Sequence, residues 1–474
     1  MILAEQAAAG NIPYSGVPMR LVPARIVPSA KPLTGLAFIA AFVRNPLQVA
    51  PQAAYEEDLV AHVVGGVARF WISGPALLKT VLLDEREKFQ KQSQIRLLAP
   101  LLGKGILTSE GADWKWQRQA AAPMFRREDL LAFVPAFVRA SEALIGKWRA
   151  SPAGSVQAID RDMSAVTFEV ISATLLPSAD DTVGPAVERS VGVFQKSGAW
   201  GQLYAMANAP KWLPRPGMVS GMRAIGTLRS SVAAMLRERR EMEAKSGHSP
   251  DDLMHRLMRA RDPESGQSMN EQQLVDNLLT FYLAGHETTA RALTWTLYLL
   301  SRSPEWSAAL EDEIGRVTGG AAVESAHIDH LVLVQQVLKE SMRLYPPVPM
   351  MSRQCVAATR LDGHDIAPGT TVVMPIYAIH RHARRWEDPD AFDPVRFAPE
   401  REAGIPRYQY LPFGAGPRIC IGMAFAMIEA SAMLATFVQR ARFAPVEGHE
   451  PAPVARVTLL PRGGMPLKVK IRQL

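Results

Sequence analysis

A cysteine in a glycine-rich loop is the residue with the clearest chemical potential in this chain. Cys420 lies within residues 413–422, FGAGPRICIG, and apolar residues at helical spacing follow it. The sulfur is therefore expected at a helix N-terminus, where free N–H groups favour the thiolate, the form that binds metals. The glycines of the loop would let its backbone approach a flat macrocycle. We interpret Cys420 as an axial ligand to haem iron; the alternative is a buried structural cysteine.

A second group of polar side chains interrupts a long apolar segment. Residues 269–300 predict one helix that is apolar on every side near its middle, until His286, Glu287 and Thr288. Buried polar groups are costly unless they have partners, so this run is a candidate functional site. The Thr288 hydroxyl is expected to bond the Ala284 carbonyl and loosen the helix there. A lone helical histidine is more often a packing residue, so His286 is expected to point elsewhere.

Two further pairs have helical spacing but are weak signals by themselves. Trp114 and Arg118 lie four residues apart, so that an indole N–H and a guanidinium can converge on one face. The alternative is a surface stacking pair. Glu340 and Arg343 lie three residues apart, and the alternative there is an exposed ion pair contributing only tenths of a kcal/mol.

The cysteine loop resembles the haem-loop signature of the cytochrome P-450 family, Phe-x-x-Gly-x-Arg-x-Cys-x-Gly. The matching positions are Phe413, Gly416, Arg418, Cys420 and Gly422. The resemblance implies haem b (iron protoporphyrin IX) as the cofactor, bound by residues that include Phe413 and Gly422. The partners that it implies for the haem propionates are Trp114, Arg118, Arg353 and Arg418.

The resemblance also assigns roles outside the cysteine loop. Residues 284–289, AGHETT, resemble the oxygen-activation motif of the family, which gives Glu287 the role of the acid and Thr288 that of the hydroxyl. A structural cluster that holds the cysteine loop is implied for Glu340, Arg343 and Arg396. The residues expected to border the substrate pocket are Leu98, Ala284, Val348 and Met350.

The predicted fold is mainly α with small β-sheets. The resemblance implies the cytochrome P-450 fold, a single domain over residues 1–474, with haem between a long central helix and the cysteine-loop helix. Residues 1–34 are rich in proline and are expected to be extended. Residues 59–64 and 67–72 flank Gly65-Gly66, a pattern that predicts a β-hairpin.

Composition limits the compartment and the partners. Two cysteines in 474 residues suit a reducing compartment, and no apolar run is long enough to span a membrane, so a cytoplasmic protein without a transmembrane anchor is expected. The formal charge of +7 comes without a long basic run, so nucleic acid is not an expected partner. We expect Lys115 and Arg126-Arg127 to help steer an acidic ferredoxin or flavodoxin, which works with its NAD(P)H reductase.

The implied activity is that of a monooxygenase that uses O2 and two electrons from separate redox partners. The expected substrate is a lipophilic small molecule of terpenoid, steroid or fatty acyl type, which is hydroxylated or epoxidised. Residues 200–212 and leucines near Leu98 favour such a ligand. One alternative is a peroxide-driven peroxygenase or isomerase of the same fold, although Glu287 and Thr288 argue against it. The other is a haem-based sensor or electron carrier.

Overall fold

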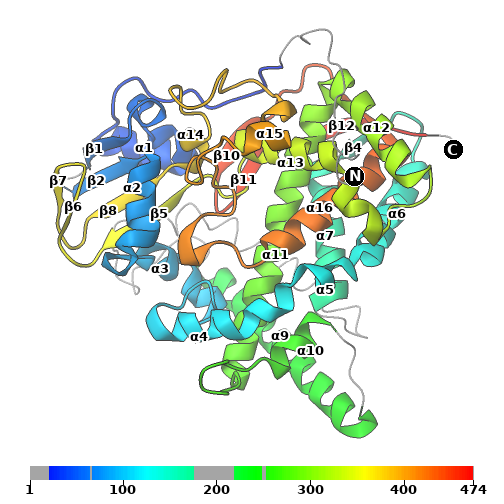
Figure 1. Ribbon diagram of the computed structural model, residues 1–474, viewed down its shortest axis with the longest axis horizontal. Coiled ribbons are helices and arrows are strands. Elements are labelled where there is room, and N and C mark those ends of the chain that lie inside the picture. The colour runs from blue at the N-terminus through cyan, green and yellow to red at the C-terminus, as the bar shows by residue number, and fades with distance from the viewer. Residues whose placement is uncertain (1–20, 65–66, 176–217, 248–251, 473–474) are drawn as a thin grey trace, which may run out of the picture.

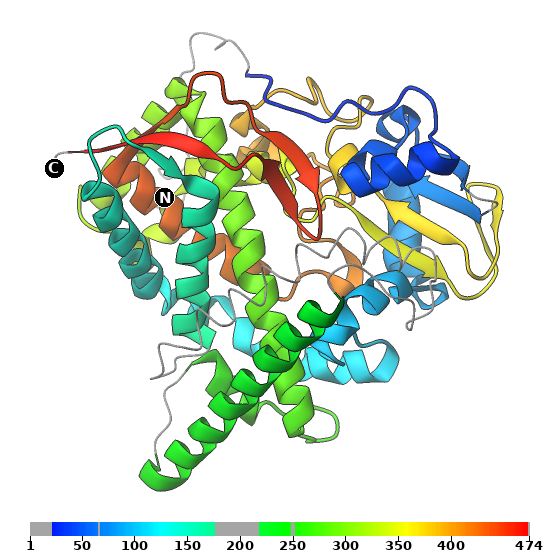
Figure 2. The same ribbon diagram turned by 180° about the vertical axis from the view of Figure 1, so that it is seen from behind.

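The computed structural model describes residues 21–64, 67–175, 218–247 and 252–472. Within them the chain is mainly helical with small sheets, which confirms the predicted fold class. A sheet-rich part lies on one side of the molecule and the long helices lie on the other (Figures 1 and 2). No helix of the described residues is long and apolar enough to cross a membrane.

The helices carry most of the described chain. The longer ones are α6 (Val134–Arg149), α7 (Ile159–Leu175), α9 (Met218–Ser246), α11 (Glu271–Ser301), α12 (Pro304–Thr318), α13 (Val332–Leu344) and α16 (Met423–Arg440). The shorter ones are α1 (Gly35–Arg44), α2 (Pro75–Lys79), α3 (Gln92–Leu102), α4 (Gly111–Ala121), α5 (Arg127–Leu131), α10 (Leu253–Arg259), α14 (Ile376–Ile379) and α15 (Pro399–Glu402).

The largest sheet has the strand order β1-β2-β8-β5-β3. Its strands are β1 (Leu59–Val64), β2 (Val67–Ile72), β8 (Thr371–Met374), β5 (Met351–Cys355) and β3 (Phe89–Gln90). The first two are antiparallel, as the sequence predicts, and their turn at residues 65–66 lies outside the described residues. The smaller sheets contain β4 (Val156–Ala158), β12 (Pro466–Ile471) and β9 (Ala441–Pro445), then β10 (Ala452–Ala455) and β11 (Leu459–Arg462), and finally β6 (Thr359–Leu361) and β7 (His364–Ile366).

Helix α11 runs through the centre of the molecule, close to the predicted residues 269–300 (Figure 1). A capping box starts it: the Asn270 side chain accepts from the Gln273 backbone N–H at 2.9 Å, and the Gln273 side chain accepts from the Asn270 N–H at 3.0 Å. Most of its side chains are buried. Helix α7 packs alongside, and the Thr167 hydroxyl donates to the His286 carbonyl at 3.0 Å.

Glu340, Arg343 and Arg396 lie together in the interior, at the end of α13. Arg343 donates to both carboxylate oxygens of Glu340 at 2.6 and 2.8 Å, and the side chains of both are fully buried. The Nε of Arg396 lies 3.4 Å from Glu340 Oε1. Arg343 also donates to the carbonyls of His380, Pro389 and Ala391. Because every part of the guanidinium has an acceptor, the buried charge is compensated.

A different buried carboxyl lies where α16 packs on α11. Glu429 is buried, and its Oε2 has no hydrogen-bond partner among the described residues. Burial raises the pKa of Glu429 to about 8, although the nearby Thr289 hydroxyl acts in the opposite direction. The folded protein therefore holds this carboxyl neutral at pH 7.

Glu429→Gln should make the stability of the protein less sensitive to pH. The unfolded chain releases the Glu429 proton near pH 4.5, whereas the folded chain keeps it up to about pH 8. The stability that this group contributes is complete below pH 4.5 and is lost as the pH rises through 8, by up to about 1.4 kcal/mol per pH unit. Urea unfolding of the holoenzyme between pH 5.5 and 8 should show a smaller decline in Glu429→Gln than in the wild type. An exposed control, Glu447→Gln, should behave as the wild type; equal declines in all three proteins would contradict the assignment.

Candidate active site

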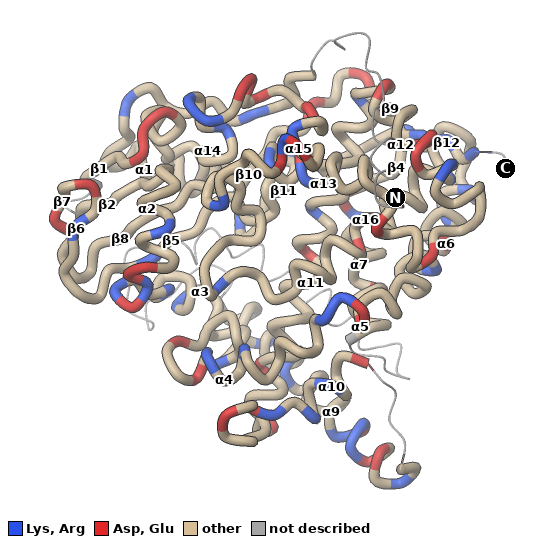
Figure 3. The backbone as a smooth tube through the Cα atoms, viewed as in Figure 1, with Lys and Arg blue, Asp and Glu red and all other residues tan. Residues whose placement is uncertain are grey.

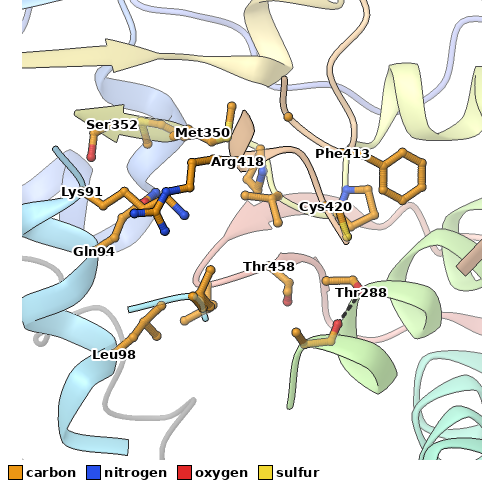
Figure 4. Close-up of a pocket in the computed structure, with 18 of the residues that line it drawn as sticks. Lys91, Gln94, Leu98, Thr288, Met350, Ser352, Phe413, Arg418, Cys420 and Thr458 are labelled. Carbon is orange, nitrogen blue, oxygen red and sulfur yellow. Dashed lines mark hydrogen bonds between the residues drawn. The ribbon is translucent and has the colours of Figure 1, made fainter. Parts of the chain in front are cut away.

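A large, mainly apolar cavity lies between α11, the cysteine loop and the largest sheet. Its volume is about 850 Å³. Cys420 and Thr288 lie on one side of the view in Figure 4, whereas Lys91 and Gln94 lie on the other side and Arg418 extends toward them. All the predicted cofactor-binding and catalytic residues line this cavity: Trp114, Arg118, Glu287, Thr288, Arg353, Phe413, Arg418, Cys420 and Gly422.

Short backbone hydrogen bonds shape the cysteine loop. The Cys420 N–H donates to the Phe413 carbonyl at 2.9 Å, and α16 begins three residues later at Met423. Gly416 has a φ of +70°, and a Cβ there would lie 2.3 Å from the Leu82 carbonyl oxygen. Glycine is therefore required at position 416 because the Leu82 backbone lies so close, whether or not a cofactor also approaches the loop.

Two opposing effects act on the Cys420 sulfur. Burial raises the pKa of the thiol, whereas the helix N-terminus acts toward the thiolate, as expected. The Gly422 N–H and the charges of Arg118 and Lys91 lower it, and they do not outweigh burial. A bound cation would therefore have to stabilise the thiolate here. Among the described residues no cluster of three or more His, Cys, Asp or Glu side chains could hold a metal ion.

Four cations surround one end of the cavity, and one carboxylate lies among them. Arg353 is buried and donates to the Ser352 carbonyl at 2.9 Å, while Arg118 donates to the Ile419 carbonyl at 2.8 Å. Burial lowers the pKa of Arg353 to about 10. The other two cations are Lys91 and Arg418, and the carboxylate is Glu110.

Trp114 has a partner that was not predicted. The indole is expected to converge with Arg118 on a propionate, and the structure in addition places the guanidinium carbon of Arg418 4.0 Å from the centre of its ring. Arg418 also donates to Glu110 at 2.7 Å. Trp114 and Glu110 together therefore fix the orientation of the Arg418 guanidinium.

Lys91 and Glu110 were not predicted from the sequence as residues of the site. Lys91 immediately precedes α3 and is buried, and burial and then the charges of Arg353 and Arg418 lower its pKa well below the usual range. Glu110 immediately precedes α4. Nothing in their local sequence indicates that two surface-type residues turn inward.

This arrangement fits haem. An excess of buried positive charge requires anions, and two propionates would supply them to Lys91, Arg118, Arg353 and Arg418. Cys420 opens into the same cavity, where it would hold the iron. The macrocycle would lie against the apolar walls that separate the sulfur from the cations.

Thr288 lies on the α11 wall of the cavity. Its hydroxyl, drawn in Figure 4, donates to the Ala284 carbonyl at 2.7 Å, as expected, and Ala284 also lines the cavity. Glu287, the expected acid, instead accepts from Arg291 at 2.9 Å and from the Thr458 hydroxyl at 3.0 Å. Neither partner was identified from the sequence, although the spacing of Glu287 and Arg291 is that of a helical ion pair.

His286 points away from this group, as expected. Its Nδ1 lies 3.0 Å from the Tyr282 carbonyl oxygen, and its ring packs edge-on against Phe168.

The residues expected to border a substrate also line the cavity. They are Leu98, Ala284, Val348 and Met350. Residues 200–212, the expected lid, lie outside the described residues.

The cysteine loop is connected to the buried ion pair of α13. The Leu411 N–H donates to His380 Nε2 at 2.7 Å, and the His380 carbonyl accepts from Arg343. Burial and the Arg343 charge lower the pKa of His380 to about 3, so its ring is neutral and can accept this bond. The Leu411 carbonyl in turn accepts from the Gly414 N–H at 3.0 Å. The expected supporting cluster therefore reaches the loop through His380.

Comparison with known proteins agrees with this geometry. The family model for cytochrome P450 matches residues 27–469. Cyclooctat-9-en-7-ol 5-monooxygenase from Streptomyces melanosporofaciens is 32% identical over 421 residues, covering 89% of this chain and 90% of that protein. Cyclooctatin synthase from the same organism is 31% identical over 434 residues, covering 92% and 93%. A cytokinin hydroxylase from Arabidopsis thaliana is 32% identical over 377 residues, covering 78% and 72%.

A solved structure shows the same architecture. The crystal structure of the cytochrome P450DA heme domain superposes with a TM-score of 0.81 at 25% identity, covering 95% of this chain and 99% of that one. Together with the cavity that joins Cys420, the four cations and Thr288, these matches show that the chain belongs to the cytochrome P450 family and is a haem-dependent monooxygenase.

Proposed function

We propose that this enzyme hydroxylates or epoxidises a lipophilic small molecule, using O2 and two electrons delivered by separate redox proteins. The observation that carries the proposal is the back-bonded Thr288 hydroxyl on the wall of an apolar cavity that Cys420 also lines. The name of one relative gives cyclooctat-9-en-7-ol as its substrate, which supports a largely hydrocarbon ligand of terpenoid type. The apolar lining of the cavity is compatible with steroid and fatty acyl ligands as well.

The cofactor and the protein divide the chemistry between them. When bound, haem supplies the oxidation chemistry, and a thiolate ligand increases the electron density at its iron. Thr288 holds a proton at Oγ1, which donates to the Ala284 carbonyl at the wall of the cavity. Glu287 is the proposed acid, and its bonds to Arg291 and Thr458 must exchange before its carboxylate can supply protons toward Thr288. The mainly apolar walls offer water few hydrogen-bond partners, which supports a proton route through these side chains.

The electron donor that we propose is an acidic ferredoxin or flavodoxin with its NAD(P)H reductase. Two of the cations expected to attract it are neutralised locally, because Lys115 pairs with Glu264 at 3.0 Å and Arg127 pairs with Asp329. Arg126 is exposed, and no ion pair of its side chain occurs among the described residues. Both charge signs occur along α4 and α5 (Figure 3). We therefore assign the steering role to Arg126 ahead of its neighbours.

The oxidant and electron source that support product formation should distinguish the candidate activities. Holoenzyme supplied with O2, NAD(P)H and a surrogate ferredoxin system should oxidise members of a terpenoid, steroid and fatty acid panel. Product formed only from added hydrogen peroxide would instead identify a peroxygenase. Stable gas binding without product under either condition would identify a sensor.

The carbon monoxide complex of the reduced holoenzyme tests Cys420. It should show the strongly red-shifted Soret band of thiolate ligation, and Cys420→Ser should abolish that band. Cys355→Ser is the matched control, since Cys355 is buried in a separate apolar cluster and its thiol donates to the Ala357 carbonyl. A shift that survives Cys420→Ser, or that disappears in Cys355→Ser alone, would overturn the ligand assignment.

Thr288→Ala should separate cofactor reduction from product formation. Without the hydroxyl, protons are delivered less selectively, so hydrogen peroxide should be released while product falls by about 10-fold or more. Haem content and substrate affinity should stay unchanged. Thr294→Ala removes a similar back-bonded hydroxyl from a buried part of the same helix and should leave the ratio of product to NAD(P)H unaltered. An unchanged ratio in Thr288→Ala would show that protons take another route.

A further inference from the structure

Glu110 brings a negative charge to the haem end of the cavity from behind the cavity wall. The haem end is the one that contains Lys91, Arg118, Arg353 and Arg418. The Glu110 carboxylate accepts from Arg418 Nη2 at 2.7 Å and from the Lys91 backbone N–H at 3.2 Å. Both partners line the cavity (Figure 4), whereas Glu110 is not among the lining residues. A cofactor in the cavity would therefore contact the cations, and the carboxylate would act on it through them.

The Arg418 guanidinium is held by protein groups on several sides. Its Nη2 donates to Glu110, and its Nη1 lies 3.5 Å from the Ile106 carbonyl oxygen. The Arg418 side chain is 14% exposed and that of Glu110 is 31% exposed, so water screens this ion pair only in part. Because opposite charges at hydrogen-bond distance cancel much of each other's field, the paired Arg418 offers less positive potential to the cavity than an unpaired guanidinium would.

The charge of Glu110 also reaches two other cations. Burial lowers the pKa of Lys91, Arg353 and Arg418, and the negative charge of Glu110 opposes that shift in all three groups. Glu110 therefore acts on the electrostatic potential of the haem end as a whole, and not on Arg418 alone.

We propose that Glu110 lowers the reduction potential of the bound haem by offsetting part of the positive charge of Lys91, Arg353 and Arg418. Reduction adds one electron to the iron, so nearby positive charge favours the reduced form and nearby negative charge opposes it. Glu110 is a positioning residue in this role, because it acts through the cations that line the cavity. The proposal requires only the haem cofactor and is independent of the substrate class and of the electron donor.

Anaerobic spectroelectrochemical titration of the substrate-free holoenzyme measures this potential directly. Glu110→Gln removes the charge and keeps an acceptor for Arg418. The equilibrium constant for reduction should rise about 3- to 10-fold, which raises the potential by about 30–60 mV because a tenfold change in a one-electron equilibrium is about 59 mV. Glu110→Asp keeps the charge on a shorter side chain, so its potential should stay close to that of the wild type.

The matched control is Asp113→Asn, which removes an exposed carboxylate from the first turn of α4. Its potential should equal that of the wild type. An unchanged potential in Glu110→Gln would overturn the proposal, and so would equal rises in Glu110→Gln and Glu110→Asp, since the effect would then follow the contact geometry and not the charge. Loss of haem from Glu110→Gln alone would overturn it as well, by showing that Glu110 holds the cofactor in place. The titration involves no turnover, so a failed oxidation assay with the expected shift would refute the proposed reaction alone.

Discussion

The buried ion pair between Glu340 and Arg343 is the interaction on which the position of the cysteine loop depends. Both side chains are fully removed from solvent, so each requires the other and every remaining donor needs an acceptor. Arg343 meets this requirement with the carbonyls of residues that precede the loop, and His380 then accepts from Leu411 at the start of the loop. The hydrogen bonds that compensate the buried charge therefore also fix the position of the backbone that leads to Cys420.

The cavity has the opposite property, because the protein compensates its positive charges only in part. Lys91, Arg118, Arg353 and Arg418 face a single carboxylate, Glu110, and burial lowers the pKa of all four cations. The Cys420 thiol is likewise shifted by burial toward its neutral form. Haem bound as proposed would reduce both imbalances, because its two propionates would offset part of the positive charge and its iron would stabilise the thiolate.

The long-range arrangement explains where sequence analysis was incomplete. The predicted acid Glu287 lies on α11 as expected, yet its carboxylate is bonded to Thr458, a residue far away in the chain. Trp114 lies in α4, and its contact with Arg418, which is distant in the chain, was not predicted. Lys91 and Glu110 had no recognisable signal because each is a single charged residue beside a helix. In each case the missing information was the identity of a spatial neighbour.

The sequence by itself determined the features that depend on a few consecutive residues. These are the signature around Cys420, the helical period of residues 269–300, the hairpin strands of residues 59–72 and the bond from Thr288 to the carbonyl four residues earlier. Only the tertiary structure decided which charges are buried, which donors lack an acceptor and how far burial changes a pKa. The physical reason is that desolvation depends on every segment packed around a group, as it does for Lys91 and Arg353 at the wall of the cavity.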